Sequence, residues 1–467
     1  MILIVILDIL SVALICSTVY RKGFERALPL VAFLLLLLPS SSRIDLPGLF
    51  DLTTQRLIIL VLGVLHFTIG KNGARRRESL PLRYLILLQI VWMVVSTANS
   101  AVFGISVKTV LSQVLDYFLV FYIVAKAVTR EQTIHKILYA LVAAMIVCSV
   151  LGTVEAYTGW SVTSLFPALP SRFVNLGPSD RGIRVQSTFI GPIFFGGALA
   201  MTIPLTMYFI PKATTTLKRV ILWIGLMLMF LNIYKTGSRG AWLALVLSLG
   251  VLFVFGYPRM RSYVLAIVIL AAMVLVLRPG VWHSLSNMYL ATKNPDSSQG
   301  ESYQWRYALY DIAVEETGKS FSRALWGYGP ESFYYLGLTT EFRVDGVMHT
   351  VAVESCDSSF AALLIETGYV GLLITALLLL GPAFITYRNY RRMPARHKTL
   401  CLILLANMLS FYFMMTNVAF YANGQQNYLL WIIIALAMIY PRIAMAQRRA
   451  EAKVQPGSEM VSCAVPA

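Results

Sequence analysis

The sequence is poor in charged residues and in cysteine. Only 13% of its 467 residues are charged, roughly half the share found in soluble domains, whereas 58% are hydrophobic and the mean hydropathy is +0.70. A water-soluble core could not bury so much apolar mass, and a disordered chain would not contain it. The composition therefore excludes a soluble enzyme and a disordered chain.

The five cysteines form no framework. Cys356 alone lies in a long hydrophilic segment, and the chain has neither a Cys-x-x-Cys motif nor a Cys/His spacing typical of metal sites. A disulfide scaffold is excluded, and no metal or other cofactor is predicted. A cleavable signal is not predicted either, because Arg21 and Lys22 follow the first apolar run instead of preceding it.

What the sequence does contain is apolar runs of a length that can cross a bilayer. We predict an all-α, polytopic transmembrane protein with about 13 (12–14) spans. The runs lie at roughly 1–20, 27–41, 57–70, 84–102, 107–128, 137–158, 188–211, 220–235, 240–256, 263–277, 358–386, 399–421 and 427–444.

The net charge of +17 would suit nucleic acid, but the basic residues fall in short clusters between apolar runs. Clusters such as those in 71–83, 129–136 and 387–398 follow alternate runs, which is the pattern of cytosolic loops. We therefore predict no nucleic-acid partner, an N-terminus outside the membrane and a cytoplasmic C-terminus.

This topology divides the chain into six parts. They are N-terminal helices (1–158), a first extracytoplasmic loop (159–187), central helices (188–277), a large extracytoplasmic loop (278–357), C-terminal helices (358–446) and a cytoplasmic tail (447–467). The large loop lies between the tenth and eleventh spans. Because it is rich in aromatic residues, we expect a folded cap with a helix near 303–316.

Three arginines stand at the predicted outer face. Arg184 precedes a span, Arg239 lies in the turn between two spans, and Arg306 belongs to the expected loop helix. A guanidinium at the membrane surface can bind a phosphate with two hydrogen bonds. It can equally bind helix-end carbonyls or headgroups, so each arginine has a structural alternative.

The segment 355–371 carries the acidic candidates. Asp357 and Ser358 could cap the following helix, or Asp357 could serve as a base, with His349 as the other contender. Glu366 lies nine residues into the span, where a carboxylate needs a basic partner or the free donors of a helix end.

In this order, the segments resemble the O-antigen ligase and O-antigen polymerase (Wzy-type) superfamily. The stretch Thr236-Gly-Ser-Arg-Gly-Ala-Trp-Leu-Ala-Leu245 is similar to the family's most recognisable signature. The other resembling segments are Arg184 with Ser187-Thr-Phe and Pro192, Trp305 with Ala308, Leu325-Trp-Gly-Tyr-Gly329, and Asp357 through Gly371.

The sequence departs from the family pattern at four positions. Asp357 and Ser358 occupy the places of the family's catalytic histidine and the asparagine after it. The family's loop arginine usually precedes the tryptophan of the loop helix, whereas Arg306 follows Trp305 here. Ser187 stands where the family pattern has glycine.

The resemblance implies a metal-independent, GT-C-like glycosyltransferase of the bacterial inner membrane. Its donor would be a glycan carried on undecaprenyl diphosphate at the periplasmic face, and its acceptor another glycan or lipid-linked molecule. Arg184 and Arg306 would bind the diphosphate, Asp357 or His349 would act as base, and Arg239 and Glu366 would support the site. Membrane lipid and other polysaccharide-assembly proteins are the further expected partners.

Three functions stay open at this point. The missing histidine–asparagine pair favours a polymerase of O-antigen or exopolysaccharide repeat units over a ligase that transfers glycan to lipid A core or another acceptor. A transporter or non-catalytic membrane protein with the same fold is the alternative of another class. Its polar midplane would have to come from the in-span acids Asp116, Glu155 and Glu366.

Overall fold

The computed structural model describes residues 2–44, 51–69, 79–166, 184–277, 279–294, 297–344, 347–421 and 424–454. Most of the predicted first extracytoplasmic loop (159–187) lies outside these residues, as does the tail beyond residue 454.

The described chain is mostly helical, and every apolar run singled out above is helical over most of its length. Eight of the described helices are long and apolar enough to cross a membrane. The chain is therefore a polytopic α-helical membrane protein. Thirteen spans stay a prediction, because several helices, such as α3 and α10, are shorter than a full crossing.

The helices of the bundle have the following bounds: α1 (Ile2–Lys22), α2 (Phe24–Leu37), α3 (Thr54–Thr68), α4 (Arg83–Ala98), α5 (Phe103–Gln113), α6 (Val120–Ala127), α7 (Glu131–Thr158), α8 (Pro192–Phe209), α9 (Thr216–Lys235), α10 (Arg239–Phe255), α11 (Pro258–Leu277), α15 (Ser359–Arg392), α16 (Ala395–Met414) and α17 (Gln426–Val454). A π-helical turn (Val114–Leu119) joins α5 to α6. Two antiparallel strands of two residues each, β1 (Arg43–Ile44) and β2 (Leu52–Thr53), precede α3.

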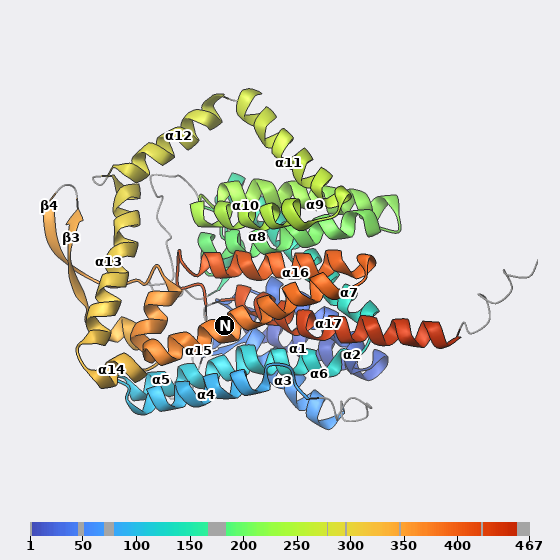
Figure 1. The fold of residues 1–467 in the computed structure, drawn as a ribbon, viewed down its shortest axis with the longest axis horizontal. Coiled ribbons are helices and arrows are strands. Elements are labelled where there is room, and N and C mark those ends of the chain that lie inside the picture. Colours follow the sequence, from blue (N-terminus) through green and yellow to red (C-terminus); the bar gives the residue numbers. More distant parts are fainter. Residues whose placement is uncertain are drawn as a thin grey trace, which may run out of the picture.

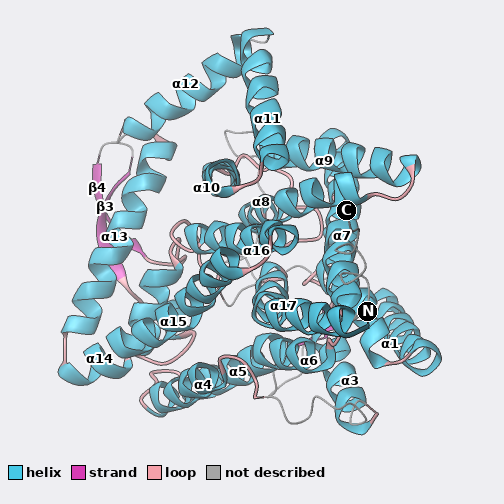
Figure 2. Cartoon of the chain, turned by 45° about the vertical axis from the view of Figure 1, so that its right-hand side comes forward, coloured by secondary structure: helices cyan, strands magenta, loops and turns pink. Residues whose placement is uncertain are grey.

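The core of the bundle is formed by α8, α16 and α17. Almost every residue of α8 is buried, and the helix packs against α7, α9, α10 and α16. Figure 2 shows α8 and α16 surrounded by the other helices. A helix that is apolar on all sides is expected at such a central position, whereas α1, α4 and α9 expose large apolar side chains at the periphery.

The segment between α11 and α15 forms a cap at one end of the bundle. It contains α12 (Pro279–Lys293), α13 (Ser298–Gly318), α14 (Phe321–Trp326) and the antiparallel hairpin of β3 (Thr339–Val344) and β4 (Val347–Ala352). At the left of Figure 1, α13 runs across the ends of the membrane helices. Its buried Leu309 and Ala313 share a small core with Ile365 of α15.

A break in α15 fixes the cap to the bundle. Gly368 has a φ of 68°, which is not helical, so the carbonyl groups just before it are free to bind outside the helix. The main-chain N–H of Tyr328 donates to the carbonyl of Ile365 at 2.8 Å, and that of Gly329 donates to the carbonyl of Glu366 at 2.9 Å. The cap is thus attached to α15 through main-chain atoms.

Candidate active site

Asp357 and Ser358, the two polar residues directly before α15, make different contacts. Ser358 is the N-cap, since its Oγ accepts a hydrogen bond from the N–H of Ala361 at 3.4 Å. Asp357 instead faces Arg306 of α13, with Oδ2 3.7 Å from Nη2, and the two side chains are 28% and 21% exposed. The capping alternative therefore fits Ser358, and the Asp357 carboxylate lies beside a cation.

Arg306 is held against the turn that follows α16. Its Nε donates to the carbonyl of Asn417 at 3.2 Å. On the other side of that turn, a Cβ on Gly240 would come within 3.0 Å of the Asn417 side chain. The glycine of the signature segment therefore lets the turn approach α10, and it brings the signature close to Arg306 and Asp357.

Arg184 lies along the turn that precedes α10. Its Nε donates to the carbonyl of Thr236 at 2.9 Å, and the N–H of Val185 donates to the carbonyl of Lys235 at 3.2 Å. Ser238 then caps α10 by accepting from the N–H of Ala241 at 3.4 Å. These hydrogen bonds join the Arg184 segment to the signature segment, which lies about 50 residues later in the sequence.

The positive charges of Arg306 and Arg184 both act on the Asp357 carboxyl. Burial raises the pKa of the Asp357 carboxyl above its ordinary value, and the positive charges of Arg306 and Arg184 oppose that rise. A carboxylate of raised pKa is a better proton acceptor than an exposed one, because catalytic efficiency increases with basicity. The arrangement offers one base next to two fixed cations.

Residues 224–376 match the family model described as O-antigen ligase. This part of the chain is similar to O-antigen ligases, which supports the O-antigen ligase/polymerase superfamily. The match confirms the resemblance seen in the motifs, and it takes in the signature segment, Arg306 and Asp357. Arg184 lies before it. No curated protein sequence matches the chain.

Within the matched segment, the other predicted residues have different surroundings. His349 is exposed on β4, opposite Phe342 of β3. Arg239 donates through Nη1 to the hydroxyl of Thr292 on α12, and the main chain of Glu331 donates to the Glu366 carboxylate. The predicted supporting roles of Arg239 and Glu366 stay predictions.

Sequence reasoning missed how the Arg184 loop is supported. The N–H groups of Gln186 and Ser187 donate to the Glu155 carboxylate at 3.2 and 2.6 Å, and the hydroxyl of Ser187 donates to the carbonyl of Cys148 at 2.7 Å. Ser187 has a φ of 55°, a conformation that favours glycine. The serine at the family's glycine position is thus tolerated because both of its polar groups are bound.

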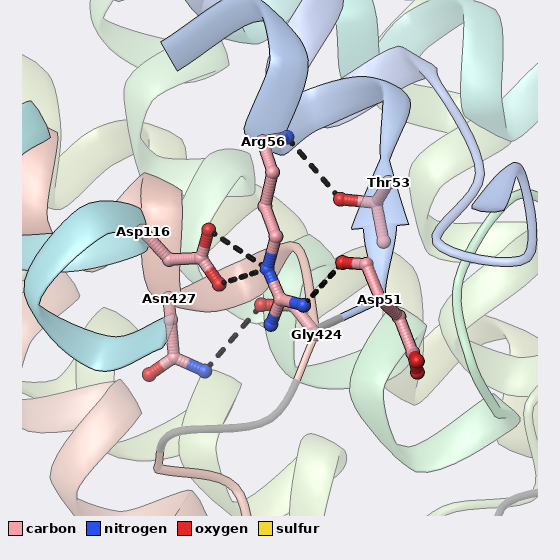
Figure 3. A network of polar contacts seen from close by, with 6 residues as sticks. All are labelled: Asp51, Thr53, Arg56, Asp116, Gly424 and Asn427. Carbon is pink, nitrogen blue, oxygen red and sulfur yellow. Dashed lines mark hydrogen bonds and ion pairs between the residues drawn. The ribbon is translucent and has the colours of Figure 1, made fainter. Parts of the chain in front are cut away.

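Asp116 also has a structural partner (Figure 3). Its carboxylate lies 3.0 Å from Nε of Arg56, whose Nη1 donates to the carbonyl of Asp51 at 2.6 Å. The sequence places Asp116 inside one apolar run, whereas its partner Arg56 lies one residue before another, 60 residues earlier in the chain.

The described residues hold no group of three or more His, Cys, Asp or Glu side chains that could bind a metal ion. The cations that the described site presents are the guanidinium groups of Arg184 and Arg306.

Proposed function

We propose that the protein is a membrane glycosyltransferase that polymerises repeat units of a bacterial surface polysaccharide, O-antigen or exopolysaccharide. The donor is a glycan on undecaprenyl diphosphate, and the reaction takes place at the periplasmic face of the inner membrane. The observation that carries this proposal is the meeting of Asp357 with Arg306 at 3.7 Å, with Arg184 near enough to affect its pKa.

The proposed step is a displacement at the anomeric carbon of the donor. The acceptor hydroxyl attacks this carbon, and the bond between the carbon and the diphosphate oxygen breaks. The acceptor's proton passes to the Asp357 carboxylate, and undecaprenyl diphosphate leaves with the bonding electron pair. Arg306 and Arg184 stabilise the negative charge that grows on the leaving group, as fixed donors do in other active sites. His349, exposed on the hairpin, is the less favoured base.

The transporter alternative depends on polar groups in the middle of the membrane. The three acids that the sequence offers for this role are each bound to a partner: Asp116 to Arg56, Glu155 to the Arg184 loop, and Glu366 to the main chain of Glu331. Because these contacts give the acids a role in the fold, they favour the enzyme over the transporter.

Deletion of the gene followed by analysis of lipid-linked glycans tests the proposal. Accumulation of single lipid-linked repeat units is expected for a polymerase. Long lipid-linked chains together with bare core lipid would instead identify a ligase, and an unchanged glycan profile with altered solute uptake would identify a transporter.

Complementation then tests the site. Asp357→Asn should fail to restore polymer, because the amide cannot accept the acceptor's proton. Glu354→Gln is the matched control, since Glu354 is an exposed carboxylate three residues earlier. If Asp357→Asn restores normal polymer at wild-type protein levels, Asp357 is not the base.

A further inference from the structure

A cavity of about 1080 Å³ lies at the end of the helix bundle opposite the candidate active site. Helix α7 connects the two ends: Glu155 near its C-terminus supports the Arg184 loop, whereas Gln132 through Ala140 near its N-terminus line the cavity. The ends of α1 and α8 and the starts of α2 and α9 complete the walls. In Figure 2, α7 lies between α1 and α9.

Basic side chains converge on this cavity from three parts of the chain. They are Lys22, Arg26, Arg130, Lys136, Lys212 and Lys218. Among the described lining residues the acid is Glu25, and its carboxylate accepts hydrogen bonds from the N–H groups of Thr129 and Arg130 at 2.9 and 3.1 Å. With six basic side chains and one acid among its described lining residues, the cavity has a surplus of positive charge.

Part of the cavity wall is apolar. Phe24, Pro29 and Phe209 line it beside the basic groups. From its edge, a strip of exposed or half-exposed residues follows one face of α7 at spacings of three or four: Tyr139, Ala143, Val147, Val150 and Val154. A small soluble anion would make no contact with this strip, whereas the acyl chains of a lipid bound in the cavity would cover it.

We propose that the cavity binds an anionic phospholipid, with its phosphate among the basic side chains and its acyl chains along α7. Basic pockets between membrane helices on the cytoplasmic side suit such headgroups. The positive charge at this end of the bundle also predicts that it faces the cytosol. This inference does not depend on the proposed glycosyl transfer.

Lipid titration of the purified full-length protein in detergent, followed by native mass spectrometry, tests the inference. The probes are dioleoylphosphatidylglycerol, dioleoylphosphatidylcholine and inorganic phosphate. The wild type should bind phosphatidylglycerol saturably and at least tenfold more tightly than phosphatidylcholine. Millimolar inorganic phosphate should not displace it.

The cavity variant combines Arg26→Gln, Lys136→Gln and Lys218→Gln, which change exposed side chains. Each charge near a headgroup contributes about fivefold to binding, so the affinity for phosphatidylglycerol should fall at least tenfold. The control variant removes three exposed charges at the same end of the bundle: Arg388→Gln, Arg391→Gln and Arg392→Gln. Its affinity should stay within twofold of the wild type.

Three results would overturn the inference. They are unchanged affinity in the cavity variant, an equal loss in the control variant, and full displacement by inorganic phosphate, which would indicate a site for a soluble anion. Thermal unfolding without added lipid checks that the variants fold. If the triple variant does not fold, Lys136→Gln alone should lower the affinity about fivefold, and an unchanged value would refute the site.

Discussion

Replacing Arg306 by glutamine removes the positive charge nearest to Asp357 while keeping a polar side chain of similar length. Unit charges about 4 Å apart interact by about 1 kcal/mol in water and about 4 kcal/mol at an effective dielectric constant near 20. The two side chains are 28% and 21% exposed, so the interaction lies between these two values.

The loss of Arg306 should therefore raise the pKa of Asp357 further, because the ionised carboxylate loses this favourable interaction. The direction follows from the charges: Arg306 favours the ionised carboxylate, and its removal favours the protonated form. Because a base must be deprotonated to act, the acidic limb of the rate profile should shift to higher pH.

The assay measures release of undecaprenyl diphosphate from a lipid-linked glycan by the purified protein in nanodiscs, from pH 4.5 to 9. Arg306→Lys is the control, since it keeps the charge and should leave the midpoint of the acidic limb nearly unchanged while lowering the rate. An Arg306→Gln midpoint equal to that of the wild type would refute the assignment of the limb to Asp357.

Three further predictions concern stability, measured as the thermal unfolding of the purified protein. Glu155→Ala should destabilise the fold by about 2–6 kcal/mol, because two buried N–H groups lose their acceptor at about 1–3 kcal/mol each. Glu155→Gln, which keeps an acceptor oxygen, should recover part of this loss, and equal effects of the two changes would contradict the reasoning. Gly368→Ala should loosen the cap and speed its limited proteolysis, because the new Cβ would collide with the carbonyl of Leu325 and φ is positive; wild-type cleavage rates would argue against this. Arg56→Ala should cost about 3–5 kcal/mol by leaving Asp116 buried without its cation, and the double change to two apolar residues should restore much of it. No recovery in the double variant would mean that the pair contributes in another way.

The membrane class and the positions of the helices could be predicted from the sequence, because apolar runs of bilayer length have few other solutions. The caps were equally local: Ser238 and Ser358 each precede a helix and accept the expected N–H. The number of spans was harder to predict, since α3 and α10 are too short to be assigned by length alone.

The site could be predicted only in part. Motif order indicated that Arg184, Arg306 and Asp357 belong together, but two contacts depend on pairings across the chain that no single sequence reveals. Asn417 supports Arg306 from 111 residues away, and Glu155 supports the Arg184 loop from about 30 residues away. A carboxylate in an apolar run indicates that a partner exists, but it does not say whether the partner is an arginine or the main chain.

The attachment of the cap at the break in α15 has a consequence for how specificity could diversify. Main-chain atoms of residues 328 and 329 bind main-chain atoms of residues 365 and 366, so the anchorage rests on the backbone, with glycine required at residue 329, where φ is positive and a Cβ would collide with Ser100. The side chains on the exposed surface of the cap, such as Tyr303 and Tyr307, can therefore be exchanged without altering its anchorage. Recognition of different sugars and a fixed position above the bundle are separable properties, and the surface of the cap can be redesigned while its attachment is left alone.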